Sequence, residues 1–164
     1  MRGFYDVMLE CEMREHAKMN AMRLPVTDVW GALALRDSAV GRLEGIAPSD
    51  LAGQGIIASR QALAGTLRDW AGDALDRMDV VATFNLPLNG RYLVRQGMGC
   101  MLTYEGLFDA SESSDLRFVP FAPRFEAHQG LVWRSSMPNK QTQAFLDAME
   151  RVCARHAEDD AGIS

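Results

Sequence analysis

The hydrophobic residues between positions 55 and 102 form short apolar runs that alternate with stretches of helical periodicity. The apolar runs, which are short enough for buried strands, lie at 55–59, 80–84 and 99–102. Apolar residues at steps of three and four predict one helix over about 61–78 and a second over about 88–96, ending at Gly97. Short connections between such alternating elements require parallel strands, so this stretch predicts an α/β sheet.

The flanking segments add further predicted elements. Strands are predicted at 4–9, 22–26, 29–35, 117–121 and 128–134. Residues 48–51 predict a helical turn that starts with proline, and the polar residues 109–115 predict a surface loop. A final helix is predicted over about 140–155, with Asn139 as its N-cap, before a charged and solvated tail.

Composition and charge limit the class of protein. The chain has 164 residues, 48% of them hydrophobic, which is enough for one domain or two small lobes. The net charge is −5 and the 17 basic residues are scattered, which argues against a large nucleic-acid surface. No apolar run approaches the roughly 18 residues of a membrane span, and the N-terminus does not look like a signal peptide. The cysteines Cys11, Cys100 and Cys153 are odd in number and far apart, which favours a reducing cytoplasm.

Two polar turns follow strands of the predicted sheet. Residues 59–61 follow the first strand, residues 83–85 end the second, and each turn precedes a helix. Because the strands are expected to be parallel, both turns would lie at the carboxyl edge of the sheet, where open α/β proteins bind ligands. The pattern therefore predicts a ligand site at this edge.

Several short motifs together resemble the effector-binding domain of LysR-type transcriptional regulators. They lie at 23–31, 50–51, 59–61, 80–83, 94–99, 118–120, 131–134 and 144–146. Among them, the Gln96-Gly97-Met98-Gly99 turn and the Trp133-Arg134 strand end before an Ala-Phe-Leu helix are the most specific. The resemblance covers the chain from Gly3 to about Val152 and implies an α/β, periplasmic-binding-protein-like (type 2) fold, with two lobes joined by two crossing strands.

The resemblance also implies how the chain is divided. Residues 26–123 would form a complete second lobe, residues 1–25 and 124–155 a partial first lobe, and residues 156–164 a polar tail. The chain would begin at the third strand of the first lobe, without the winged helix-turn-helix domain, the linker helix and the first two strand–helix units. The strand at 4–9 would then have an open edge, and we expect it to fray or to associate with a second copy.

Carried over residue by residue, the resemblance places an effector site between the lobes. The implied ligand-binding residues are Ser59, Arg60, Gln61, Thr83, Phe84, Asn85 and Tyr104 on the second lobe, with Glu10 facing them from the first. Some of these residues have other interpretations. Ser59 could only cap a helix, Arg60 could be a surface salt-bridge residue, and Asn85 could be a turn or capping residue.

No catalytic or metal-binding constellation is recognisable, and no cofactor is expected. His16, His128 and His156 lack the spacing of metal ligands, and the motifs of nucleophilic, phosphate-binding and dinucleotide-binding sites are missing from the sequence. Trp30, Trp70 and Trp133 fit strand or helix patterns and are expected to be core or lobe-packing residues. Cys100 is expected to be a small buried hydrophobic residue. We therefore do not expect an enzyme.

The leading hypothesis is a ligand-sensing effector-binding domain of a LysR-family regulator that holds a small anionic or aromatic molecule between two α/β lobes. The expected partners are this effector, DNA only through a winged helix-turn-helix domain absent from this chain, and a second copy in a homo-oligomer. No membrane partner is expected, and the expected location is the cytoplasm. The alternatives are a free-standing solute-binding module of the same fold and a gene remnant without function.

Overall fold

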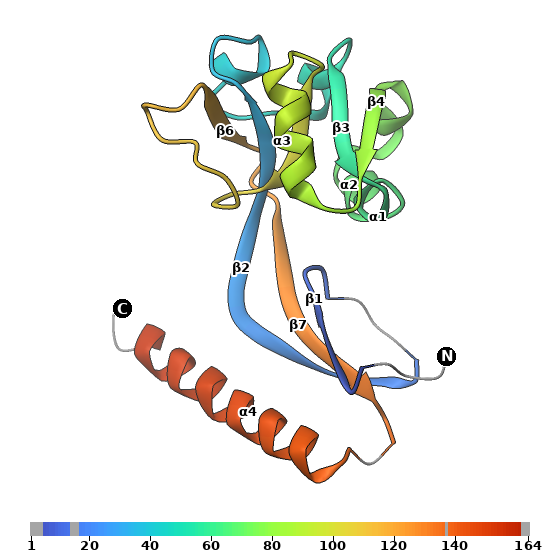
Figure 1. Cartoon of the computed structure of the whole chain (residues 1–164), viewed down its shortest axis with the longest axis vertical. Helices are drawn as coiled ribbons and strands as arrows, with labels where there is room; N and C mark the ends of the chain where they lie inside the picture. The colour runs from blue at the N-terminus through green and yellow to red at the C-terminus, as the bar shows by residue number, and fades with distance from the viewer. Residues whose placement is uncertain (1–4, 14–16, 137, 162–164) are drawn as a thin grey trace. The chain divides into compact units, whose positions relative to one another are not determined.

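The computed structural model describes residues 5–13, 17–136 and 138–161. The helices and strands, with η marking short 3₁₀ helices, are β1 (Val7–Glu10), β2 (Met19–Leu35), η1 (Val40–Arg42), η2 (Pro48–Leu51), β3 (Gly55–Ser59), α1 (Arg60–Leu63), α2 (Thr66–Ala71), η3 (Gly72–Arg77), β4 (Asp79–Phe84), α3 (Pro87–Arg95), β5 (Cys100–Tyr104), β6 (Leu116–Pro120), β7 (Glu126–Arg134) and α4 (Lys140–Ala161) (Figure 1). The chain forms two compact units. The first unit is Met1–Asp28 with Ala127–Ser164, and the second unit is Val29–Glu126. The predicted strand start at residue 4 and His16 lie outside the described residues.

The second unit is built on the predicted α/β sheet. Strand β3 runs parallel to β4, with Ser59 opposite Phe84, and parallel to β5, with Ile57 opposite Met101. Helical segments return the chain between these strands, which is why the strands point the same way. Strand β2 extends the sheet, antiparallel to both β5 and β6. The predicted parallel arrangement is confirmed.

The single helix predicted over 61–78 is wrong, because glycines divide this segment. Helix α1 ends at Leu63, Gly65 precedes α2, and Gly72, at φ +51°, separates α2 from η3. Glycine adopts this backbone conformation without the steric cost that a side chain would add. The apolar stripe nevertheless keeps its role, since Leu67 and Leu75 are buried.

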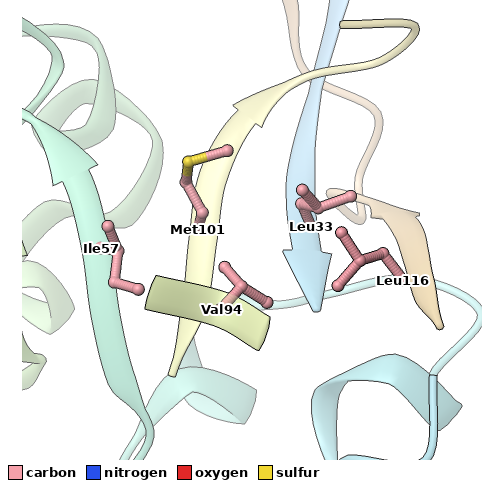
Figure 2. Close-up of a cluster of buried hydrophobic side chains, with 5 residues drawn as sticks. All are labelled: Leu33, Ile57, Val94, Met101 and Leu116. Atoms are coloured by element: carbon pink, nitrogen blue, oxygen red, sulfur yellow. The ribbon is translucent and has the colours of Figure 1, made fainter. Parts of the chain in front are cut away.

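Buried aliphatic side chains join the strands of the second unit to α3. The cluster consists of Leu33, Ile57, Val94, Met101 and Leu116 (Figure 2). Each fully buried aliphatic side chain of this kind contributes about 1.5–3 kcal/mol relative to an exposed one. Gly90 lets α3 approach this cluster closely, because a Cβ there would collide with Met101 Sδ.

Strand β2 corrects a second prediction. The separate strands expected at 22–26 and 29–35 are one continuous strand of 17 residues that passes through Pro25. Proline cannot donate to a neighbouring strand, so it is tolerated where one side of a strand is open. Strand β5 pairs with the Trp30–Leu33 part of β2. The missing backbone N–H of Pro25 therefore costs no hydrogen bond to β5.

The first unit contains β1, β7 beyond Glu126, the first part of β2, and α4. Strands β1 and β7 pair antiparallel, with Val7 opposite Trp133 and Glu10 opposite Gly130. Asn139 caps α4 as predicted, because its Oδ1 accepts a hydrogen bond from the Thr142 N–H at 2.9 Å. The helix continues to Ala161, beyond its predicted end near residue 155. Within the described residues, no helix combines the length and the apolar character needed to cross a membrane.

Candidate ligand-binding site at the carboxyl edge of the second unit

The strands β3, β4 and β5 end at the same edge of the sheet. Ser59 is the last residue of β3, Phe84 of β4 and Tyr104 of β5. Since these strands are parallel, the polar residues that follow β3 and β4 come together, as expected for an open α/β sheet. Seven of the eight predicted site residues lie in the second unit at this edge.

Ser59 acts as the N-cap of α1. Its Oγ accepts a hydrogen bond from the Ala62 N–H at 3.0 Å, which confirms the capping interpretation. A cap of this kind contributes about 1 kcal/mol to stability. The cap uses the hydroxyl oxygen only as an acceptor, so the hydroxyl proton can still be donated to a ligand.

Arg60 bridges the ends of β3 and β4. Its Nε donates a hydrogen bond to Thr83 Oγ1 at 3.3 Å, and both residues are exposed. In the described part of the chain no salt bridge joins Arg60 to a carboxylate. A guanidinium has five N–H donors in a planar fork that matches a carboxylate or phosphate. Arg60 can therefore hold an anion while Thr83 fixes one side of the fork.

The start of α1 adds less to anion binding than the sequence suggested. The argument from polarised N–H groups assumed a helix to residue 78, whereas α1 has only four residues. The aligned dipole of a helix grows with the number of peptide units, so one turn is a weak source of positive potential. The Arg60 guanidinium, and not the start of α1, is therefore the group at this edge suited to attract an anion.

Phe84, Asn85 and Gln61 differ in what they present at this edge. The Phe84 side chain packs against the buried cluster beside α3, and is half-buried. Asn85 is exposed in a bend between β4 and α3, which fits a turn residue. It does not cap α3, because Leu86 is the N-cap position and that end has no side-chain cap. Gln61 is exposed in the first turn of α1.

Tyr104 belongs to an aromatic stack. Its ring centroid lies 4.4 Å from that of Trp30, which is only 3% exposed. The Trp30 ring is parallel to Phe121, and Phe121 stacks on Trp70 at 3.7 Å. Trp30 is buried as predicted, but its contact with Tyr104 depends on the β2–β5 register, which the sequence alone does not reveal. Trp30 positions the Tyr104 ring at the edge.

Glu10 ends β1 in the first unit, where it is half-buried opposite Gly130.

Cys100 is buried as predicted, and desolvation raises the pKa of its thiol to about 11. The thiolate, which is the nucleophile, is therefore disfavoured. Among the described residues, no three His, Cys, Asp or Glu side chains come together as they would around a metal ion.

The fold defines the class of protein first. In the second unit β3 lies between parallel β4 and β5, and strands β2 and β7 each have residues in both units. This is the arrangement of a periplasmic-binding-protein-like (type 2) fold. The family follows from a model of the LysR substrate binding domain, which matches residues 3–154. The chain belongs to this family.

Solved structures of low sequence identity share the fold. HinK, a LysR family transcriptional regulator from Pseudomonas aeruginosa, is 14% identical over 90% of this chain and 53% of its own, with a TM-score of 0.69. Full-length CbnR, solved with its target DNA, is 11% identical over 93% and 54%, with a TM-score of 0.72. The CcmR regulatory domain from Synechocystis PCC6803, in complex with 2-PG, is 16% identical over 90% and 73%, with a TM-score of 0.69. The chain thus spans about half of HinK and CbnR. A comparison with curated protein sequences gives no match.

Proposed function

We propose that this chain is the ligand-sensing part of a LysR-family transcriptional regulator. The observation that carries the proposal is the Arg60–Thr83 bridge at the carboxyl edge, with a guanidinium that has no carboxylate partner among the described residues. Family membership supports it, as does the fold shared with a regulatory domain solved in complex with 2-PG. The effector is a small molecule that carries an anionic group.

The predicted site residues take distinct roles in this proposal. Arg60 binds the anionic group, and the Ser59 hydroxyl, Gln61 and Asn85 donate hydrogen bonds beside it. Tyr104, held by Trp30, offers a ring against which an aromatic or apolar part of the effector can pack. Thr83 positions Arg60, and Phe84 supports the edge from the core side.

The proposed output is regulation of transcription rather than catalysis. Ligand binding would change the population of conformations and pass that change to a winged helix-turn-helix domain outside these 164 residues. CbnR, which shares the fold, was solved with its target DNA. We also propose that the protein acts in the cytoplasm, where it would reach the DNA it regulates, and that it acts as a homo-oligomer.

Thermal unfolding of the purified chain with small acids and their neutral amides tests the ligand proposal. The panel contains aliphatic and aromatic carboxylic acids, each beside its amide of nearly the same shape. A ligand that binds the folded state raises the midpoint of unfolding, so acids should raise it and the amides should not. Equal shifts by acid and amide would contradict the role of the Arg60 charge, and no shift by any acid would count against the proposed site.

A second experiment separates a regulator from a free-standing binding module. Genomic sequence upstream of the Met1 codon should encode, in the same frame, a winged helix-turn-helix domain if the chain acts in transcription. A secretion signal in frame at that position would instead favour the solute-binding alternative.

A further inference from the structure

We propose that a cavity in the first unit binds a neutral, polyhydroxylated ring of monosaccharide size. The cavity has a volume of about 300 Å³, which is at the lower end of the range for small-molecule sites. Its walls come from residues just before β1, at the end of β7 and around the start of α4. All of them belong to the first unit, so none is part of the carboxyl edge of the second unit.

The pairing of β1 with β7 brings two residues of opposite charge to the cavity. Val7 lies opposite Trp133, so Asp6, which precedes Val7, and Arg134, which follows Trp133, are neighbours at the end of the strand pair. The Asp6 carboxylate only accepts hydrogen bonds, whereas the Arg134 guanidinium has five N–H groups and only donates them. The two formal charges cancel, which favours a ligand without net charge that has both donors and acceptors. Hydroxyl groups are both.

Thr142 lines the same cavity with a buried hydroxyl group. The residue is only 8% exposed, and among the described residues its hydroxyl has no hydrogen-bond partner. The hydrogen bond of Thr142 to Asn139 Oδ1 at 2.9 Å is donated by the backbone N–H instead. A buried polar group without a partner is unfavourable, and a ligand hydroxyl would satisfy it. Asn139 Nδ2 reaches Asp6 Oδ2 at 3.5 Å, which is long for a hydrogen bond, so both side chains can turn to a ligand.

Two aromatic side chains complete the lining. Tyr5 is exposed, Trp133 is half-buried, and both border the cavity. The C–H groups on one face of a sugar ring are apolar and pack against an aromatic ring, while the hydroxyl groups around the ring point outward. A sugar therefore matches both the aromatic and the polar parts of the lining, whereas a small zwitterion would use only the two charges.

Saturation-transfer NMR on the 164-residue chain tests the class of ligand. The probes are D-glucose, D-galactose and D-mannose, beside tetrahydropyran-2-methanol, which has the same ring with a single hydroxyl, and L-serine, which is a zwitterion. At least one sugar should receive saturation from the protein, and the other two compounds should not. Binding of L-serine without any sugar, equal signals from tetrahydropyran-2-methanol and the sugars, or no binding by any probe would overturn the proposal.

Removal of the Asp6 carboxylate locates the bound sugar. Asp6→Ala should raise the dissociation constant of the sugar by at least about tenfold, because the ligand loses a hydrogen bond to a charged group. Glu150→Ala is the matched control, since it removes an exposed carboxylate of α4 in the same unit that does not line the cavity, and it should leave the constant unchanged. NMR titration measures both constants, and equal effects of the two variants would contradict the proposal.

Thr142→Val tests the buried hydroxyl without relying on a destabilised variant. Because this hydroxyl has no hydrogen-bond partner among the described residues, its removal should not lower the midpoint of thermal unfolding. The dissociation constant of the sugar should rise roughly three- to tenfold. A lower midpoint with unchanged sugar affinity would show that the hydroxyl is structural and would contradict the proposal. The cavity and Arg60 lie in different units, so this proposal and the proposed effector site can fail separately.

Discussion

Arg60 donates a hydrogen bond from Nε to Thr83 Oγ1 at 3.3 Å, although 23 residues separate the two in the chain. The parallel register of β3 and β4 makes this contact, since Ala58 lies opposite Thr83 and Ser59 opposite Phe84. The hydrogen bond ties together the two polar turns that follow these strands. It also leaves the terminal nitrogens of the guanidinium as donors for a ligand.

Arg60→Ala should weaken binding of an acidic ligand by about 1.5–3 kcal/mol, since a hydrogen bond to a charged group is worth that much. Calorimetric titration with the best acid from the panel measures this change. Arg77→Ala is the control, because Arg77 is an exposed arginine just before β4, at the opposite end of that strand from Thr83. Unchanged affinity in the Arg60 variant would remove Arg60 from the site.

Ser59→Ala should lower the free energy of unfolding by about 1 kcal/mol, because the Ala62 N–H loses its capping acceptor. Urea denaturation followed by circular dichroism measures the difference. Ser49→Ala, at an exposed serine in η2, should change stability by less than about 0.5 kcal/mol. An equal effect of the two variants would show that the Ser59 cap contributes little.

Gly90→Ala should destabilise the second unit. Alanine favours the helix by about 1 kcal/mol, but its Cβ would meet Met101 Sδ inside a tightly packed core, at a cost of about 1–3 kcal/mol. Combining it with Met101→Ala removes this collision, so the double variant should be less destabilised than the sum of the single variants. If the losses of unfolding free energy in the two single variants, measured by urea denaturation, simply add up in the double variant, α3 can move away from the sheet.

Cys100 should make stability depend on pH above its usual titration range. The folded-state pKa is raised from 9.0 to about 11, because desolvation disfavours the thiolate. Between these values the unfolded chain releases the thiol proton first, so rising pH favours unfolding by at most about 1.4 kcal/mol per pH unit. This contribution is complete below pH 9 and is lost as pH rises towards 11. The free energy of unfolding of Cys100→Ala, measured by denaturation at several pH values across this range, should fall less steeply with pH than that of the unmodified chain.

The order and type of most elements could be predicted from the sequence, because local patterns carry that information. Gly97 ends α3 as predicted, at φ +73°, a conformation that glycine adopts readily. Hydrophobic periodicity gave the wrong helix length where glycines interrupt the helical backbone. The apolar stripe around Leu67 was correctly predicted to be buried, but Gly65 and Gly72 divide the helix that carries it.

Contacts between distant residues were decided by the tertiary structure. The sequence placed Ser59, Arg60 and Thr83 at one sheet edge, because parallel strands end together. Whether Arg60 reaches Thr83 or a carboxylate, and whether Trp30 lies beside Tyr104, depends on strand register, since a shift of one residue turns each side chain to the other face. Register is set by packing over the whole sheet, so no local stretch of the sequence contains it.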